Sequence, residues 1–242
     1  ASGWSSDVCS SDLFDGEFWK FGVERTVDPA LRMGGMPKPR TPGGPPIHVS
    51  VATPNSSTAK LAGERNWGPV SSSLLSGAAL ATQWRDYSKA LAGAGHEVTG
   101  ANWRIVRTVL VAPTDAEAER RLLHADSSVF FYYDYIRQVL TRAGRIIAFK
   151  TRPDMADHEV NTRDVMMSRT IFGSPATVRD KILALRAEAG PFCNLLMSGM
   201  DWSGPNEAWE RESIELMAKE VWPAVRRQIE ARDGAAAAVA AQ

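Results

Sequence analysis

The residues whose types and spacing best suit ligand chemistry lie in a polar turn that contains Asn55, Ser56 and Thr58. An apolar run at 47–52 precedes this turn and predicts a buried strand, and the residues after the turn predict a helix. The first turn of a helix presents unpaired backbone N–H groups and the positive end of the helix dipole, which together favour a phosphate. Small polar residues also begin most helices as N-caps, so capping is the simpler explanation of the pattern by itself.

A second candidate helix start lies at Gly173, Ser174 and Pro175. Serine suits the N-cap position and proline suits the first helical position. If the strands of the protein are parallel, this start lies on the same face as the first and could contact a cofactor. The pattern favours capping alone.

Aromatic side chains crowd into a third segment, within a stretch at 129–161 where hydrophobic periodicity is weak. Such rings could cover an apolar substrate as a lid, stack on a planar cofactor, or simply pack in the core. The candidates for a substrate-facing role are Phe130, Phe131, Tyr132, Tyr133 and Tyr135.

Other sequence signals of catalysis are missing. The four histidines and two cysteines show no metal-ligand spacing, so we expect no metal site. Dinucleotide-binding, P-loop and nucleophile-elbow motifs are also absent from the sequence. The catalytic residue is therefore unknown at this stage.

The charge balance is neutral, with 28 Lys+Arg against 28 Asp+Glu in 242 residues. This balance favours neither nucleic acid nor an anionic membrane as a partner. No apolar run approaches the ~18 residues of a membrane span. Because two cysteines cannot make a disulfide framework, we expect a cytoplasmic protein.

The elements that must position these residues alternate between strand and helix. Apolar strands are predicted at 47–52, 69–73, 103–112 and 192–199, with helical patterns between them and a final helix after Asn206, kinked at Pro223. This alternation predicts an α/β fold with a parallel sheet. Four units cannot close an eight-stranded barrel, so the chain is either a small open sheet or part of a barrel.

The two ends of the chain have a different character from its middle. Residues 1–13 contain a repeated Ser-Ser-Asp phrase and are interpreted as a non-native sequence scar. Residues 14–46 are rich in glycine and proline and predict an irregular connecting loop. Residues 47–233 hold the repeated units, and 234–242 predict a flexible Ala-rich tail.

Several separated stretches resemble the bacterial-luciferase-like, flavin-utilising monooxygenase family, most of all its limonene monooxygenase-like subgroup. The stretches are 14–21 (FDGEFWKF), 55–63 (NSSTAKLAG), 173–178 (GSPATV), 192–202 and 212–223 (ESIELMAKEVWP). The resemblance extends from Phe14 to about Arg232.

The resemblance implies that the chain is the C-terminal half of a (β/α)8 TIM barrel, strands five to eight, with an irregular insertion after strand seven. It places Asn55 and Thr58 on phosphate-contacting positions, with Ser56 as a further donor and Ser72 in the same cofactor site. The implied cofactor is FMN in its reduced form, FMNH2, supplied by a separate flavin reductase. The implied reaction uses O2 to oxygenate a small, hydrophobic substrate, and a homo-oligomer is possible.

Two alternatives stay open beside this interpretation. One is a deazaflavin (F420)-dependent oxidoreductase of the same superfamily, which the phosphate turn does not distinguish. The other is a non-catalytic α/β binding domain of four units. Under the leading interpretation, strands one to four have no counterpart in this sequence, so we expect the chain alone to be inactive and poorly soluble.

Overall fold

The structure is a computed structural model that describes residues 13–18, 20–22, 44–150, 152, 154–199, 201 and 204–240. It divides into two compact units, Ala1–Ile47 and His48–Gln242. The first unit contains an antiparallel strand pair, β1 (Leu13–Asp15) and β2 (Lys20–Gly22). This short strand pair lies mostly within the stretch predicted to be a largely irregular connection, and most of that stretch is outside the described residues. Residues 23–43 and nearly all of the proposed scar lie outside the described residues.

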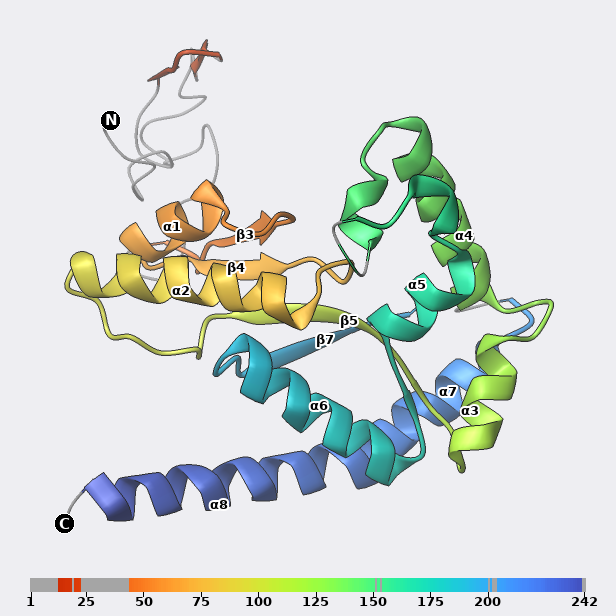
Figure 1. The fold of residues 1–242 in the computed structure, drawn as a ribbon. Helices are drawn as coiled ribbons and strands as arrows, with labels where there is room; N and C mark the ends of the chain where they lie inside the picture. The colour runs from red at the N-terminus through yellow and green to blue at the C-terminus, as the bar shows by residue number, and fades with distance from the viewer. Residues whose placement is uncertain are drawn as a thin grey trace, which may run out of the picture. The chain divides into compact units, whose positions relative to one another are not determined.

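A parallel sheet organises the second unit and confirms the predicted α/β class (Figure 1). The central strand pairs with three others: its residues 104–105 pair with 70–71, and two further strands pair with its first and second halves. Residues 104–108 pair with 194–198, and residues 108–111 pair with 170–173. The strands are β3 (His48–Val51), β4 (Gly68–Ser71), β5 (Arg104–Val111), β6 (Thr170–Gly173) and β7 (Asn194–Ser198).

Four of these strands match the predicted ones, and β6 does not. Its residues follow a helix directly, without a glycine or proline between them, so no local signal separates the strand from the helix. The central strand was recognised because apolar residues occupy five of its eight positions and fall on both of its faces, as expected when both faces are covered.

Helices follow the strands as the sequence predicts, and several begin with the predicted caps. Thr114, for example, accepts the backbone N–H of Glu117, which confirms the N-cap expected there. The helices are α1 (Ser57–Glu64), α2 (Gly77–Gly93), α3 (Asp115–Leu122), α4 (Ser128–Arg142), α5 (Thr162–Arg169), α6 (Pro175–Ala189), α7 (Glu207–Leu216) and α8 (Trp222–Ala240).

The segment at 129–161 is not irregular, contrary to the prediction. Residues 129–142 belong to α4, followed by 3₁₀ turns at Ile146–Phe149 and Asp157–Glu159, and α5 begins directly after the segment. The helical period was hidden because apolar residues occupy consecutive positions from 129 to 133 and so fall on every side of the helix.

The final helix is interrupted close to the predicted kink at Pro223. A π-helical turn, Met217–Val221, separates α7 from α8, and the N–H of Trp222 donates to the Met217 carbonyl. Proline has no N–H, and its ring crowds the carbonyl four residues earlier. The wider turn accommodates both effects. Helix α8 then continues to Ala240, so the backbone of the Ala-rich stretch is helical and not an unstructured tail.

Aromatic packing holds α2 against the sheet. Trp103 is fully buried, and its ring stacks on that of Trp84 with centroids 5.3 Å apart and an interplanar angle of 12°. The Phe192 ring meets the Trp103 ring edge-on, with ring centroids 6.3 Å apart. These contacts fix the helix that carries several of the polar side chains described below.

Candidate functional site

The polar turn at the end of β3 adopts the helix-start geometry that its sequence predicts. Ser56 is the N-cap of α1, and its hydroxyl accepts the backbone N–H of Thr58 at 3.2 Å. Ser56 is buried, whereas Asn55 is exposed and has a φ of 48°. The capping role is therefore confirmed for Ser56, and capping does not use the side chains of Asn55 and Thr58.

Helix α2 holds Asn55 in place from the side. The backbone N–H of Asn55 donates to Thr82 Oγ1 at 2.9 Å, and its side-chain Oδ1 accepts from Arg85 at 2.8 Å. The Arg85 guanidinium also bonds to Asp86 at 3.0 Å. Sequence analysis missed Arg85, because thirty positions separate it from Asn55 and no local pattern links them.

A buried amide fastens the two strand ends beneath the turn. Gln83 is 1% exposed, and its Nε2 donates to the Thr53 carbonyl at 2.7 Å. Its Oε1 accepts from the Ser71 hydroxyl at 2.6 Å, and that hydroxyl accepts the indole N–H of Trp103 at 2.9 Å. Because these groups satisfy one another away from water, they hold the ends of β3 and β4 in a defined position.

Ser72 lies at the same edge of the sheet. Its backbone N–H donates to the Val51 carbonyl at 3.1 Å, and its hydroxyl accepts the N–H of Leu74 at 3.3 Å. The buried Arg107 donates to the Ser72 carbonyl at 3.3 Å and to the Leu75 carbonyl at 2.9 Å. Burial lowers the pKa of Arg107 to about 10, so it stays charged at neutral pH. The four predicted cofactor residues thus lie at the carboxyl ends of β3 and β4.

This arrangement has the chemistry of an anion site. The first turn of α1 contains no acidic residue, and the exposed donors around it are hydroxyls, an amide and a guanidinium. Helix dipole, N–H groups and guanidinium all favour a negatively charged group of the size of a phosphate. The residues present therefore fit the phosphate end of a flavin mononucleotide.

The second helix start contains an anion from the chain itself. Asp115 Oδ1 accepts the backbone N–H of Ser174 at 2.6 Å, and Oδ2 accepts the Thr177 hydroxyl at 2.9 Å. These two bonds hold the pKa of Asp115 below its ordinary value, and the bond from the Ser174 backbone contributes most. Ser174 caps α6 by accepting the N–H of Thr177, which confirms the favoured capping prediction.

The predicted aromatic residues are spread around α4. Tyr133 is fully buried, and its hydroxyl donates to Thr108 Oγ1 at 3.4 Å. Phe130 and Tyr132 are partly buried and pack against the hydrophobic core cluster that contains Tyr133. Phe131 and Tyr135 are 72% and 57% exposed. The helix therefore does not present the five rings to a single space.

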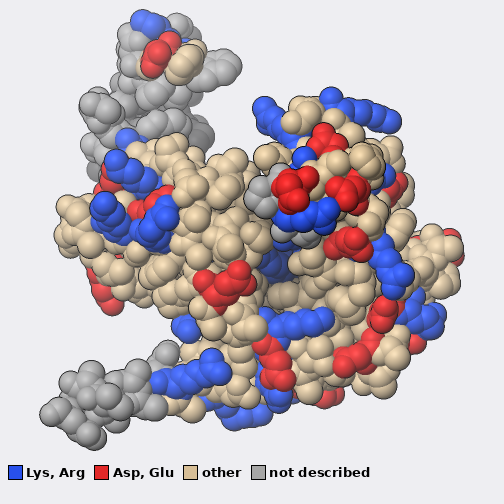
Figure 2. All heavy atoms as spheres, in the orientation of Figure 1, with Lys and Arg blue, Asp and Glu red and all other residues tan. Residues whose placement is uncertain are grey.

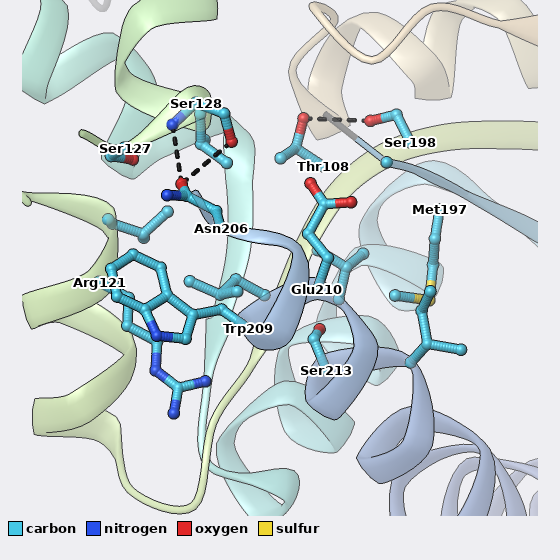
Figure 3. A pocket seen from close by; sticks show the side chains of 16 residues that line it. Thr108, Arg121, Ser127, Ser128, Met197, Ser198, Asn206, Trp209, Glu210 and Ser213 are labelled. Carbon is cyan, nitrogen blue, oxygen red and sulfur yellow. Dashed lines mark hydrogen bonds between the residues drawn. The ribbon is translucent and has the colours of Figure 1, made fainter. Parts of the chain in front are cut away.

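A cavity of about 210 Å³ lies between the start of α7 and the carboxyl ends of β5 and β7 (Figure 3). We refer to it as the α7 cavity. Asn206 borders it and is 5% exposed, and its Oδ1 accepts from both the N–H and the hydroxyl of Ser128. Sequence analysis did not identify this space. Its polar lining includes Thr108, Ser128, Ser198, Asn206 and Glu210.

Among the residues that the structure describes, charged and metal-binding groups form no further cluster. On the face drawn in Figure 2, the described Lys and Arg side chains are interspersed with Asp and Glu. Within the described part of the chain, His, Cys, Asp and Glu form no cluster of three that could hold a metal. None of the helices that the structure describes combines the length and apolar character needed to cross a bilayer.

Comparison with known proteins identifies the family to which this chain belongs. The family model of the luciferase-like monooxygenases matches residues 12–191. The chain belongs to this family.

The particular relatives come from Pseudomonas putida. 3,6-Diketocamphane 1,6-monooxygenase is 31% identical over 182 residues, which cover 75% of this chain and 47% of the relative. 2,5-Diketocamphane 1,2-monooxygenase 1 is 26% identical over 190 residues, covering 74% and 49% respectively. The chain thus spans about half the length of the curated relatives that it matches.

A solved structure agrees with this relationship. The oxygenating constituent of 3,6-diketocamphane monooxygenase, a type II Baeyer-Villiger monooxygenase in complex with FMN, superposes with a TM-score of 0.72 and 28% identity. The superposition covers 87% of this chain and 57% of that one. The luciferase-like family that the sequence resembles is therefore confirmed.

Proposed function

We propose that residues 47–233 are the carboxyl-terminal part of a luciferase-like (β/α)8 barrel and that the turn at the start of α1 binds the phosphate of FMN. One observation carries the proposal: a helix N-terminus without acidic residues has Arg85 bound to its Asn55, in a chain of this family. The relative in complex with FMN supports this choice of cofactor.

In this proposal each residue of the turn has a separate task. The hydroxyl of Thr58 and the amide of Asn55 donate to phosphate oxygens, and Ser56 keeps the first turn of α1 capped. Ser72 and Gln83 position the adjoining strand ends. Arg85 supplies positive charge beside the turn.

When bound, reduced FMN supplies the reaction with O2 that oxygenates the organic substrate. The chain's part is to anchor the phosphate and to keep water from the bound groups. A separate flavin reductase as partner, a small hydrophobic substrate and a cytoplasmic location belong to the same proposal. A role for the α4 aromatics as a substrate cover also belongs to it, and Phe131 and Tyr135 are the exposed candidates.

Titration calorimetry with FMN and with riboflavin tests the phosphate site directly. Because riboflavin lacks the phosphate, we expect the 242-residue chain, produced with a cleavable solubility partner, to bind FMN about tenfold more tightly or better. Replacement Thr58→Val should reduce this preference, whereas Thr141→Val on α4 should leave it unchanged.

The same titration separates the alternatives. Equal affinity for FMN and riboflavin contradicts the phosphate site. Binding of F420 in preference to FMN supports the deazaflavin alternative. A cooperative thermal transition that neither cofactor shifts supports a non-catalytic binding domain.

A further inference from the structure

The α7 cavity has the size and walls of a binding site for a small organic molecule. A cavity of about 150 Å³ in another protein holds benzene, so about 210 Å³ admits a somewhat larger ring compound. Much of its lining is apolar, contributed by Leu122, Val129, Met197, Trp209 and Ile214. Arg120 and Arg121 both lie 5.7 Å from the Trp209 ring centre, which holds this wall in place.

Hydroxyl groups mark one end of the cavity. Thr108 is 1% exposed, and its Oγ1 lies 3.3 Å from Ser198 Oγ. Thr108 Oγ1 also accepts the hydroxyl of Tyr133 at 3.4 Å. Thr108 and Ser198 each carry one hydroxyl hydrogen, and the bond between them uses one of the two. The pair can therefore donate the other to a ligand.

A carboxylate faces the same end. Figure 3 shows the side chain of Glu210 directed from α7 toward Thr108 and Ser198. Glu210 Oε1 accepts the backbone N–H of Asp201 at 2.9 Å. A carboxylate has about four lone-pair positions and can accept several bonds at once, so Glu210 can also accept a hydrogen from a ligand.

We propose that the α7 cavity binds a small alcohol, a hydrocarbon ring with one hydroxyl group. An alcohol oxygen accepts from the Thr108–Ser198 pair while its hydrogen is donated to Glu210. A ketone of the same shape can only accept, and it would leave its oxygen beside the carboxylate without a hydrogen between them. The lining therefore selects for the hydroxyl group and not only for size.

This inference does not depend on flavin, because none of the residues that carry it belongs to the phosphate turn. Binding can be measured in the absence of FMN, with cyclohexanol and cyclohexanone as a matched pair of probes. In ligand-detected NMR titrations, we expect cyclohexanol to bind the 242-residue chain about tenfold more tightly than cyclohexanone. Failure of FMN to bind would leave this result standing.

Replacement Glu210→Gln tests the preference for an alcohol over a ketone, because it should change the order of the two affinities and not only lower them. The amide can keep the bond from Asp201 through its oxygen and can donate to a ketone through its nitrogen. We expect the preference for cyclohexanol to disappear or reverse in this variant. If Glu210 had only a structural role, its replacement would weaken the binding of cyclohexanol and cyclohexanone alike.

Two further variants test the location. Ile214→Trp fills the cavity and should abolish binding of both probes, whereas Leu61→Trp, at a similarly exposed position on α1, should not. If Ile214→Trp does not fold, Thr108→Val removes one hydroxyl with little change of shape and should weaken cyclohexanol selectively. Equal affinity of the unaltered chain for both probes, no binding of either, or an unchanged preference in Glu210→Gln overturns the proposal.

Discussion

Helices α1 and α6 begin alike but treat the positive end of the helix dipole differently. Each follows a parallel strand and starts with a serine whose hydroxyl accepts a backbone N–H, Ser56 in α1 and Ser174 in α6. At α6, the carboxylate of Asp115 accepts the backbone N–H of Ser174 and the hydroxyl of Thr177. At α1, the charged side chain bound to the turn is the cation Arg85, which donates to Asn55 and also to Asp86.

We propose that the chain leaves one helix start open for a ligand and uses the other for its own structure. Both starts favour an anion for the same physical reason. Asp115 provides that anion within the chain, so the donors at the start of α6 are already bonded. At α1, the surrounding donors add to the attraction, which is why we propose the phosphate of FMN there.

The largest effect on this comparison is expected where α1 contacts α2. A Cβ added at Gly63 would lie 2.5 Å from the Tyr87 carbonyl oxygen and 2.7 Å from Ala90 Cβ. We expect Gly63→Ala to destabilise the protein by about 3 kcal/mol, because the helices must move apart. Urea unfolding measures this effect, and the displaced turn should also bind FMN more weakly.

Gly93 in α2 provides the matched control. It is also a helical glycine, but a Cβ added there meets nothing within 4 Å. Gly93→Ala should therefore leave stability unchanged or raise it by up to about 1 kcal/mol. Equal effects of the two substitutions would show that close packing of α1 does not position the turn.

Replacement Gln83→Leu should have the next largest effect. It leaves the Thr53 carbonyl and the Ser71 hydroxyl without their buried partner, at a cost of about 2 kcal/mol. We also expect FMN affinity to fall, since the strand ends beneath the turn lose their connection. Gln138→Leu, which removes only the bond to Asp134 on α4, should not change FMN affinity.

The start of α6 should be sensitive to acid. Asp115 has a folded-state pKa below its unfolded value of about 3.9, so its stabilising contribution is complete above that value. The contribution is lost as the pH falls through the lowered folded-state pKa. The stability difference between the unaltered chain and Asp115→Asn should therefore shrink in acid.

Unfolding midpoints measured at a series of pH values check this expectation. Thr177→Val removes one of the bonds that lower the pKa but keeps the carboxylate, so it should give an intermediate pH dependence. If the stability difference between the unaltered chain and Asp115→Asn stays constant down to the most acidic conditions, the Asp115 carboxylate does not stabilise the start of α6 as expected.

The smallest effect on stability is expected for Arg85→Gln. Arg85 is exposed and its ion pair with Asp86 is a surface pair, so stability should change by no more than about 0.5 kcal/mol. FMN affinity should nevertheless fall about tenfold, because a charge-assisted bond is lost. Lys89→Gln, three residues from Asp86 on the same helix, controls for general loss of positive charge. Unchanged FMN affinity in Arg85→Gln would remove Arg85 from the proposed site.

Much of the fold followed from local patterns. The four predicted strands and the caps at Ser56, Thr114 and Ser174 depend on residues a few positions apart, which sequence periodicity reports well. The prediction was wrong for α4, where consecutive apolar residues hide the period, and it missed β6, which directly follows a helix and forms by pairing with β5.

The sequence by itself therefore determined the α/β class, the family resemblance and the helix starts suited to an anion. Tertiary structure decided how each start is used, because the deciding side chains come from distant positions. Arg85 meets Asn55 across thirty residues, and Asp115 meets Ser174 across fifty-nine. Only the packing of α2 and α3 brings these groups together, and no local preference of the chain encodes a contact over such a separation.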